Sequence, residues 1–245
     1  MNRFPIAVLL FVSGLAHGQV SSPEFTKVAK KFEAGKFASA LESAESLIDN
    51  DKHRKKPEPY LWASMCYYEI YRSGDEKLNQ LYRSALRNAL KYAGKAVSKD
   101  KNGNIAENNS EYFVTMKEQG IAYATRYLED GNARKASYTY KQILKFAPDD
   151  QNVRFVKAIT DIKLNNNFEA EREINASFPV LEANYRDLEY QPDPVSSPLL
   201  MDAIIYYIDH LVQNTYIDSA KAVTMSARVF FPLDEEINKR YNDLK

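Results

Sequence analysis

Apolar and polar positions follow the helical period along most of the chain. Ala, Leu and Tyr recur at spacings of three and four residues, and stretches that alternate with a period of two are hard to find. A repeat near 3.6 residues places such side chains on one face of an α-helix. Breaks at Pro, Gly, Asn and Asp predict helices over the ranges 22–34, 37–50, 58–72, 76–98, 110–130, 133–147, 151–164, 168–176, 197–213, 216–230 and 233–244. We therefore expect an all-α protein.

The predicted helices fall into pairs. In each pair an aromatic-rich helix is followed by a short polar turn and an alanine-rich helix. Alanine lets two helix backbones approach closely, and an aromatic ring fills the space beside the crossing. One hairpin alone leaves an apolar face uncovered, so the pattern predicts hairpins that stack on one another.

One segment shows the repeat most clearly. Its characteristic residues are, in order, Ala124, Tyr127, Gly131, Asn132, Ala136, Tyr140, Ile143 and Pro148. Ala220, Ala227 and Pro232 repeat the later part, and the spacing from first alanine to proline is 12 positions in both copies. This pattern resembles the tetratricopeptide repeat (TPR), which has small and aromatic residues at the helix crossing, a glycine turn and a closing proline.

The resemblance implies a right-handed α-α superhelix with about five helix pairs, a C-terminal capping helix and a concave groove lined by the first helices. Ala136 and Ala220 are 84 positions apart, which is not a multiple of the 34-residue repeat. Four prolines between 178 and 198 favour an irregular insert there. We therefore expect repeats over 19–177, an insert over 178–198, and a final hairpin with its cap over 199–245.

The first residues read as an export signal. A short positive start at Met1–Arg3 precedes an apolar stretch over 4–16, and small residues at Ala16 and Gly18 match the positions that a signal peptidase reads. We expect a signal peptide over 1–18, cleavage after Gly18 and a periplasmic or secreted protein. The stretch is shorter than the roughly 20 apolar residues of a membrane span, and no cysteine follows it to take a lipid.

Charge and chemistry narrow the function classes. The chain has 33 basic and 33 acidic residues, a balance that gives no support for a nucleic-acid partner. The basic run over 52–56 is interpreted as a solvated loop. Cys66, the one cysteine, is interpreted as a buried core residue, and only three histidines occur. No metal or cofactor motif is present, so we expect no catalytic residues, no metal, no cofactor and no enzyme activity.

Partner-binding residues follow from the groove of the family. The first helices of the second and third repeats would present Leu61, Met65, Tyr68, Glu69, Ile121, Thr125, Leu128 and Glu129. Tyr185 and Tyr190 lie in an acidic, proline-ended segment that either docks a partner, folds over the groove as a lid or forms a plain surface loop.

These observations favour a non-catalytic scaffold or adaptor that binds protein partners in a periplasmic or cell-envelope assembly. One alternative is an extracytoplasmic binder of a glycan or peptide, with aromatic side chains as its platform. A second is an accessory subunit of an outer-membrane protein assembly or secretion machine, which would place the protein in a membrane-associated complex without a membrane span of its own.

Overall fold

The computed structural model describes Pro23 and residues 25–245, so the predicted signal peptide lies outside the described residues. The described residues form only helices and connections. The helices are α1 (Thr26–Glu33), α2 (Phe37–Asp49), α3 (Glu58–Arg72), α4 (Glu76–Leu81), α5 (Ala85–Lys99), α6 (Asn104–Asn108), α7 (Ser110–Glu129), α8 (Ala133–Ile143), α9 (Gln151–Ile162), α10 (Asn167–Arg186), α11 (Pro198–Gln213), α12 (Ile217–Phe230) and α13 (Glu235–Asp243). None of them is both long and apolar enough to cross a membrane.

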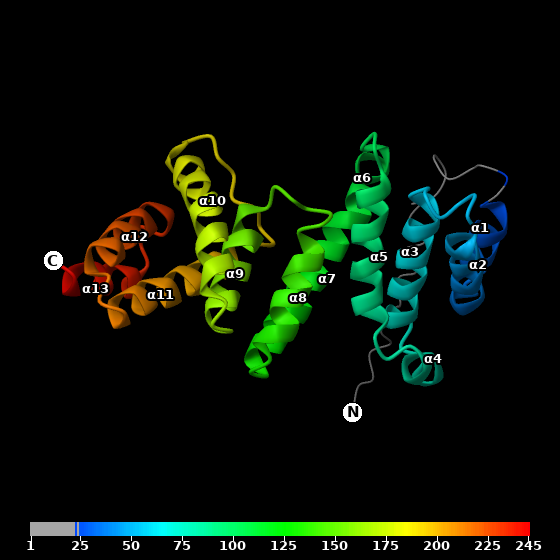
Figure 1. Ribbon diagram of the computed structural model, residues 1–245, viewed down its shortest axis with the longest axis horizontal. Coiled ribbons are helices and arrows are strands. Elements are labelled where there is room, and N and C mark those ends of the chain that lie inside the picture. Colours follow the sequence, from blue (N-terminus) through cyan, green and yellow to red (C-terminus); the bar gives the residue numbers. More distant parts are fainter. Residues whose placement is uncertain (1–22, 24) are drawn as a thin grey trace, which may run out of the picture.

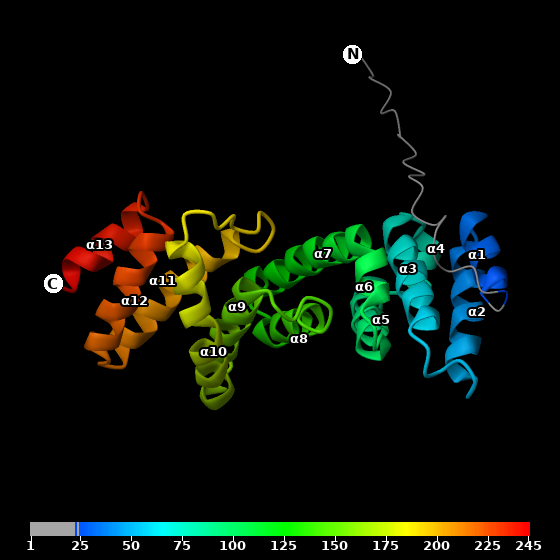
Figure 2. The same cartoon turned by 90° about the horizontal axis from the view of Figure 1, so that it is seen from above.

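The long helices pack as hairpins in a single row (Figures 1 and 2). The pairs are α1 with α2, α3 with α5, α7 with α8, α9 with α10, and α11 with α12, and each pair also contacts its neighbour. The last helix, α13, packs against α12 and closes the row. The all-α class, the five pairs and the C-terminal capping helix that the sequence predicts are therefore confirmed for the described part of the chain.

Alanine occupies the helix crossings, as the repeat pattern predicts. Ala124 and Ala136 pack within the third hairpin and Ala220 within the fifth, and all three are fully buried. The turn between α7 and α8 is made by Gly131, whose φ of 72° is a left-handed value that costs glycine little. Asn132 then caps α8 by accepting a hydrogen bond from the Lys135 backbone N–H at 3.3 Å.

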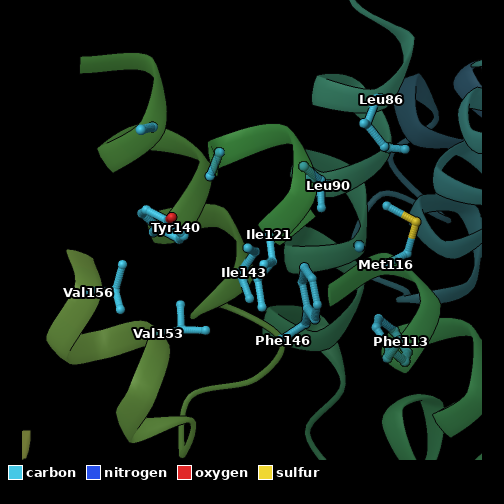
Figure 3. Close-up of a cluster of buried hydrophobic side chains, with 14 of the residues drawn as sticks. Leu86, Leu90, Phe113, Met116, Ile121, Tyr140, Ile143, Phe146, Val153 and Val156 are labelled. Atoms are coloured by element: carbon cyan, nitrogen blue, oxygen red, sulfur yellow. The ribbon is translucent and has the colours of Figure 1, made fainter. Parts of the chain in front are cut away.

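One core runs without interruption through the middle of the row. Figure 3 shows Leu90 of α5, Met116 of α7, Ile143 of α8 and Val153 of α9 in one cluster, and all four are buried. Gly120 of α7 permits this packing, because a Cβ there would meet Leu90 at 2.9 Å and Ile143 at 3.0 Å. Neighbouring hairpins are thus coupled by shared side chains rather than joined by a linker.

The predicted helix over 76–98 is two helices. Asp75 begins α4 by accepting hydrogen bonds from the backbone N–H groups of Lys77 and Leu78. The helix ends at Leu81. At the next residue, Tyr82, the backbone leaves helical geometry and the ring packs edge-on against Tyr67 at a centroid distance of 6.1 Å. Helix α5 starts three residues later and pairs with α3, so α4 is a short addition within the second hairpin.

The irregular insert predicted over 178–198 is also shorter than expected, because α10 continues through Pro179 to Arg186. Ser177 and Leu181, on either side of the proline, are buried on the same face of α10, whereas Pro179 itself is exposed. The carbonyl that loses its helical N–H partner therefore faces solvent and can bind water, so the proline costs less than it would inside a core. The non-helical segment is limited to residues 187–197.

Candidate partner-binding surfaces

Helix α3 presents less of its predicted groove face than expected. Leu61 is 1% exposed and Tyr68 is buried, and Met65 is half-buried against the core. The prediction that Leu61 and Tyr68 face a groove is wrong, because α3 is covered by both α2 and α5 and its Tyr68 ring packs against Tyr112 of α7. Glu69 remains accessible at the surface, where it pairs with Arg72 at 3.3 Å.

Helix α7 divides its predicted residues between core and surface. Ile121 is buried and Leu128 packs half-buried against the core, so Ile121 cannot contact a partner from its position. Thr125 and Glu129, farther along α7, line an open hollow. One helical turn separates these two residues, which places them on one face. The prediction for Ile121 is wrong because α7 packs against both α5 and α8, and Ile121 lies in that packing.

The hollow lies between the end of α3 and the second half of α7 and has a volume of about 440 Å³. We name it the α3–α7 hollow. Its lining residues are Tyr71, Gln119, Ala122, Tyr123, Thr125, Arg126 and Glu129. Tyr71 is 43% exposed, a large fraction for an aromatic side chain next to a hollow.

Aromatic rings and charges share this hollow. The hydroxyl of Tyr127 donates to that of Tyr123 at 2.6 Å, and their ring centroids are 4.6 Å apart. Burial and the neighbouring Tyr127 raise the pKa of Tyr123 to about 12, so its phenol stays protonated at neutral pH. Arg126 and Glu129 supply one charge of each sign. A rigid aromatic surface with polar groups at its edge is typical of sites that bind polypeptide.

The described residues hold no cluster of three or more His, Cys, Asp or Glu side chains that could bind a metal ion. Cys66 is fully buried, as predicted, and burial beside Glu45 and Glu69 raises its pKa to about 12. Its thiol therefore remains protonated and enclosed at neutral pH, which disfavours a nucleophilic role.

Tyr185 and Tyr190 belong to the packing of the C-terminal half. The Tyr185 ring lies 4.6 Å from the Phe230 centroid and 5.2 Å from the Tyr190 centroid, so it joins α10 to the end of α12. Burial raises the pKa of Tyr185 to about 12. Both rings are half-buried, and neither lines the α3–α7 hollow.

The segment over 187–197 is fastened to α7 and α9. Asp193 accepts a hydrogen bond from the Lys117 ammonium at 2.6 Å, and Lys117 also pairs with Asp150 at 3.2 Å. Ser196 adds a buried hydrogen bond from the Asn152 amide at 3.0 Å. Burial opposes ionisation of Asp193, but Lys117 and the backbone N–H of Ser196 prevail and hold its pKa below the usual value. No residue of this segment lines the α3–α7 hollow, so the segment is not a lid over it.

A second surface is one that the sequence reasoning missed. Lys91, Lys95 and Lys99 follow one another at single turns along α5, and Lys141 of α8 and Lys145, just beyond the end of α8, lie beside them. We name these five residues the lysine face. The Lys99 ammonium lies 4.9 Å from the Tyr60 centroid, and that of Lys95 lies 5.2 Å from the Tyr92 centroid. The spacing of four residues between Lys91, Lys95 and Lys99 is visible in the sequence. That these lysines lie beside α8 is not.

Close packing of α5 and α8 sets the two lysine rows together. A Cβ at Gly94 would lie 2.8 Å from the Lys145 Cβ, so only glycine allows this approach. Burial, and then the charges of Lys91, Lys99 and Lys145, lower the pKa of Lys95. Burial, followed by Lys141 and Lys91, likewise lowers the pKa of Lys145. These directions show that the positive charges repel one another.

The lysine face continues into a second open hollow of about 700 Å³ at the end of α5. Lys99 belongs to both, and Lys55, Lys56 and Lys101 also line this hollow, together with two acidic residues, Glu58 and Asp100. The basic run over 52–56, interpreted from sequence as a solvated loop, therefore adds two lysines to the same side of the molecule. Its His53 is 7% exposed and packs edge-on near Phe25 at 6.3 Å, so it is part of the core and not of the solvated loop.

Comparison with known proteins adds little to this geometry. No protein-family model matches the chain, and no curated protein sequence matches it. Among solved structures, the TPR2AB domain of yeast Sti1 in its pHSP90 complex is similar, with 14% identity over 90% of this chain and 84% of that chain and a TM-score of 0.36. A likeness at that score is weak, and the fold of this chain is defined by its own helix packing.

Proposed function

We propose that this protein is a non-catalytic scaffold that binds a polypeptide segment of a partner in the α3–α7 hollow. The observation that carries the proposal is the exposed Tyr71 beside Tyr123, at a hollow formed by the first helices of two neighbouring hairpins. Tyrosine contributes a large, rigid contact area with a polar tip, and such side chains dominate the binding energy of many interfaces. The TPR resemblance of the sequence supports the same class of function.

The setting of that function is also a proposal. The apolar stretch over 4–16 and the small residues Ala16 and Gly18 support export to the periplasm or cell envelope. N-terminal sequencing of the C-terminally tagged protein, recovered from the organism that makes it, tests export directly. We expect a first residue of Gln19, whereas a chain that retains Met1 would contradict the proposal of a cleaved signal.

Site-specific crosslinking tests the binding site itself. A photoreactive amino acid at Ala122, inside the hollow, is expected to form an adduct with one partner protein in the native source. Ala176 on α10 is exposed and remote, so the same amino acid there provides the matched control. Adducts of equal yield at both positions would contradict a specific site.

Two tyrosines with nearly equal exposure allow binding in the hollow to be distinguished from binding elsewhere on the surface. Tyr71 is 43% exposed and Tyr138 on α8 is 42% exposed. Tyr71→Ala is expected to lower the affinity for the crosslinked partner by about tenfold or more, the usual loss when an interface anchor is removed. Tyr138→Ala should leave its affinity within about twofold. Equal losses, or none at Tyr71, would overturn the assignment of the hollow.

A further inference from the structure

We propose that the lysine face binds an acidic segment of another polypeptide chain, with carboxylates that repeat about every 6 Å. The lysine face and the α3–α7 hollow share no residue, so this proposal stands independently of the proposed function.

The first argument is that these charges have no counter-ion within the described part of the protein. Ion pairs there are made by other cations, such as Lys117, Lys157, Arg154 and Arg240. None joins Lys91, Lys95, Lys99, Lys141 or Lys145 to a carboxylate. The hydrogen bond of the Lys145 ammonium goes to the neutral amide of Gln142, at 3.1 Å.

The second argument is that the ammonium groups are held in place before any partner arrives. Tyr60 lies under Lys95 and Lys99, and Tyr92 lies under Lys91 and Lys95, with ammonium-to-centroid distances of 4.9 to 5.8 Å. The Tyr60 hydroxyl is itself fixed, because it donates to the Arg54 carbonyl at 2.9 Å. Side chains that are already ordered lose less entropy on binding.

Spacing indicates the form of the partner. Residues four apart on a helix rise by about 6 Å. Alternate side chains of an extended chain repeat at about 6.6–6.8 Å, so carboxylates at every second position of a strand come close to the lysine spacing. A partner carboxylate between the two lysine rows would also relieve the repulsion that Lys145 and Lys95 experience.

Two other polyanions fit this surface less well. Proteins that bind single-stranded nucleic acid stack bases on free aromatic faces, whereas ammonium groups already cover Tyr60 and Tyr92. A peripheral membrane site adds exposed apolar side chains to its basic residues. On α5 and α8, Tyr138 is the single large apolar or aromatic side chain that is exposed. These features favour a protein partner.

The acidic segment must come from a chain other than the N-terminal part of this one. Residues 1–22 contain no Asp and no Glu, so they offer nothing to pair with five lysines. Glu45 and Asp49 of α2 act on Tyr92, whose ring lies under Lys91 and Lys95. They border the lysine face without forming an ion pair with it, and they leave its charges for a partner.

Fluorescence anisotropy of labelled peptides tests the proposal on the full chain. One probe carries Glu at alternate positions, and a second of equal length carries Gln at those positions. We expect the Glu peptide alone to bind, and the triple variant K91Q/K95Q/K99Q to weaken it by about tenfold or more. The control K77Q/K221Q/K239Q removes the same charge from exposed lysines elsewhere, and its affinity should stay within about twofold.

Several outcomes would overturn the proposal. Equal binding of the Glu peptide by the wild type and K91Q/K95Q/K99Q would show that the lysine face is not the site. Tighter binding of a labelled oligothymidine, or of vesicles rich in anionic lipid, that is lost in the triple variant would reassign it to nucleic acid or membrane. Self-association in sedimentation that the triple variant abolishes would make a second copy the occupant. Ala122→Trp fills the α3–α7 hollow and should leave binding of the Glu peptide unchanged. The proposal for the hollow and the proposal for the lysine face can therefore fail separately.

Discussion

Lysine serves two opposite purposes in two regions of this molecule. Where α7, α9 and the segment over 187–197 meet, the Lys117 side chain is 12% exposed and lies between Asp150 and Asp193. On α5 and just beyond the end of α8, Lys95 and Lys145 lie among other lysines and have no carboxylate partner among the described residues. A buried cation that is paired holds elements together, whereas surface cations left unpaired repel one another and remain available to a partner. The comparison teaches that charge balance over a whole chain hides local imbalance.

High pH is expected to have the largest effect on stability. As the pH rises, the N-terminal half, which holds the lysine face, should unfold before the C-terminal half. Burial raises the pKa of Tyr112 and Tyr67 far above 10, and that of Tyr140 to about 12. A phenol whose pKa is raised on folding stabilises the fold fully below pH 10, and this stabilisation is lost as the pH rises from 10 through the folded pKa. In the C-terminal half, burial raises the pKa of Tyr185 to about 12 and also raises those of Tyr190 and Tyr207.

Trp62, the one tryptophan, lies in α3 and reports on the N-terminal half alone. Between pH 10 and 12 its emission maximum should move to the red before far-ultraviolet circular dichroism shows half of the helix lost. Lys95 and Lys145 act in the opposite sense, because their lowered pKa values mean that deprotonation favours the fold, but these side chains are more exposed. Simultaneous loss of both signals would contradict the predicted order.

Breaking the paired lysine should have the next largest effect. Lys117→Met leaves Asp150 and Asp193 close together without a cation, and we expect the free energy of unfolding to fall by about 3 kcal/mol. Urea denaturation measures this loss. Arg172→Gln removes an exposed cation from the half-buried Glu169 and Glu173, and it should leave the urea midpoint almost unchanged. Equal losses of stability in the two variants would mean that Lys117 does not fasten the segment over 187–197 to α7 and α9.

The contact of Gly94 with Lys145 can be broken next. Gly94→Val places a branched side chain where even a Cβ would lie 2.8 Å from the Lys145 Cβ, so α8 must move away from α5. Overpacking of this kind costs roughly 1–3 kcal/mol. Ala176→Val introduces the same residue at an exposed position of α10 and should cost about 0.5 kcal/mol or less. Similar melting temperatures for the two variants would show that α5 and α8 do not pack tightly.

The helical pattern predicted most of the fold because local signals and tertiary packing agree. Ala136 marks a helix crossing and Gly131 marks a turn, and both serve those purposes in the structure. The prediction failed where packing outweighs a local signal. Pro179 reads as a break, but Leu181 and Phe178 are packed on the far side of α10 from it, and the helix continues.

The candidate surfaces were harder to predict from sequence, because a surface is defined by which helices meet. Thr125 and Glu129 line the α3–α7 hollow, and their binding of a partner stays a prediction, whereas Ile121, four positions before Thr125, is core. The lysine face joins residues about 50 positions apart through the Gly94 contact. Nothing in a single sequence reports that contact, although the spacing of Lys91, Lys95 and Lys99 does report their common helix face.

Removing charge from the lysine face should change stability the least. The variant K91Q/K95Q/K99Q loses two close ammonium contacts, Lys99 with Tyr60 and Lys95 with Tyr92, each worth about 0.5–1 kcal/mol at an exposed site. Two longer contacts, at 5.7 and 5.8 Å, contribute less. It also relieves like-charge pairs four residues apart, worth roughly 0.2–0.5 kcal/mol each, and the cost of burying charge on Lys95. These terms oppose one another, so the free energy of unfolding should change by less than about 1 kcal/mol. A loss as large as that of Lys117→Met would make the lysine face structural, and the two uses of lysine would then be one.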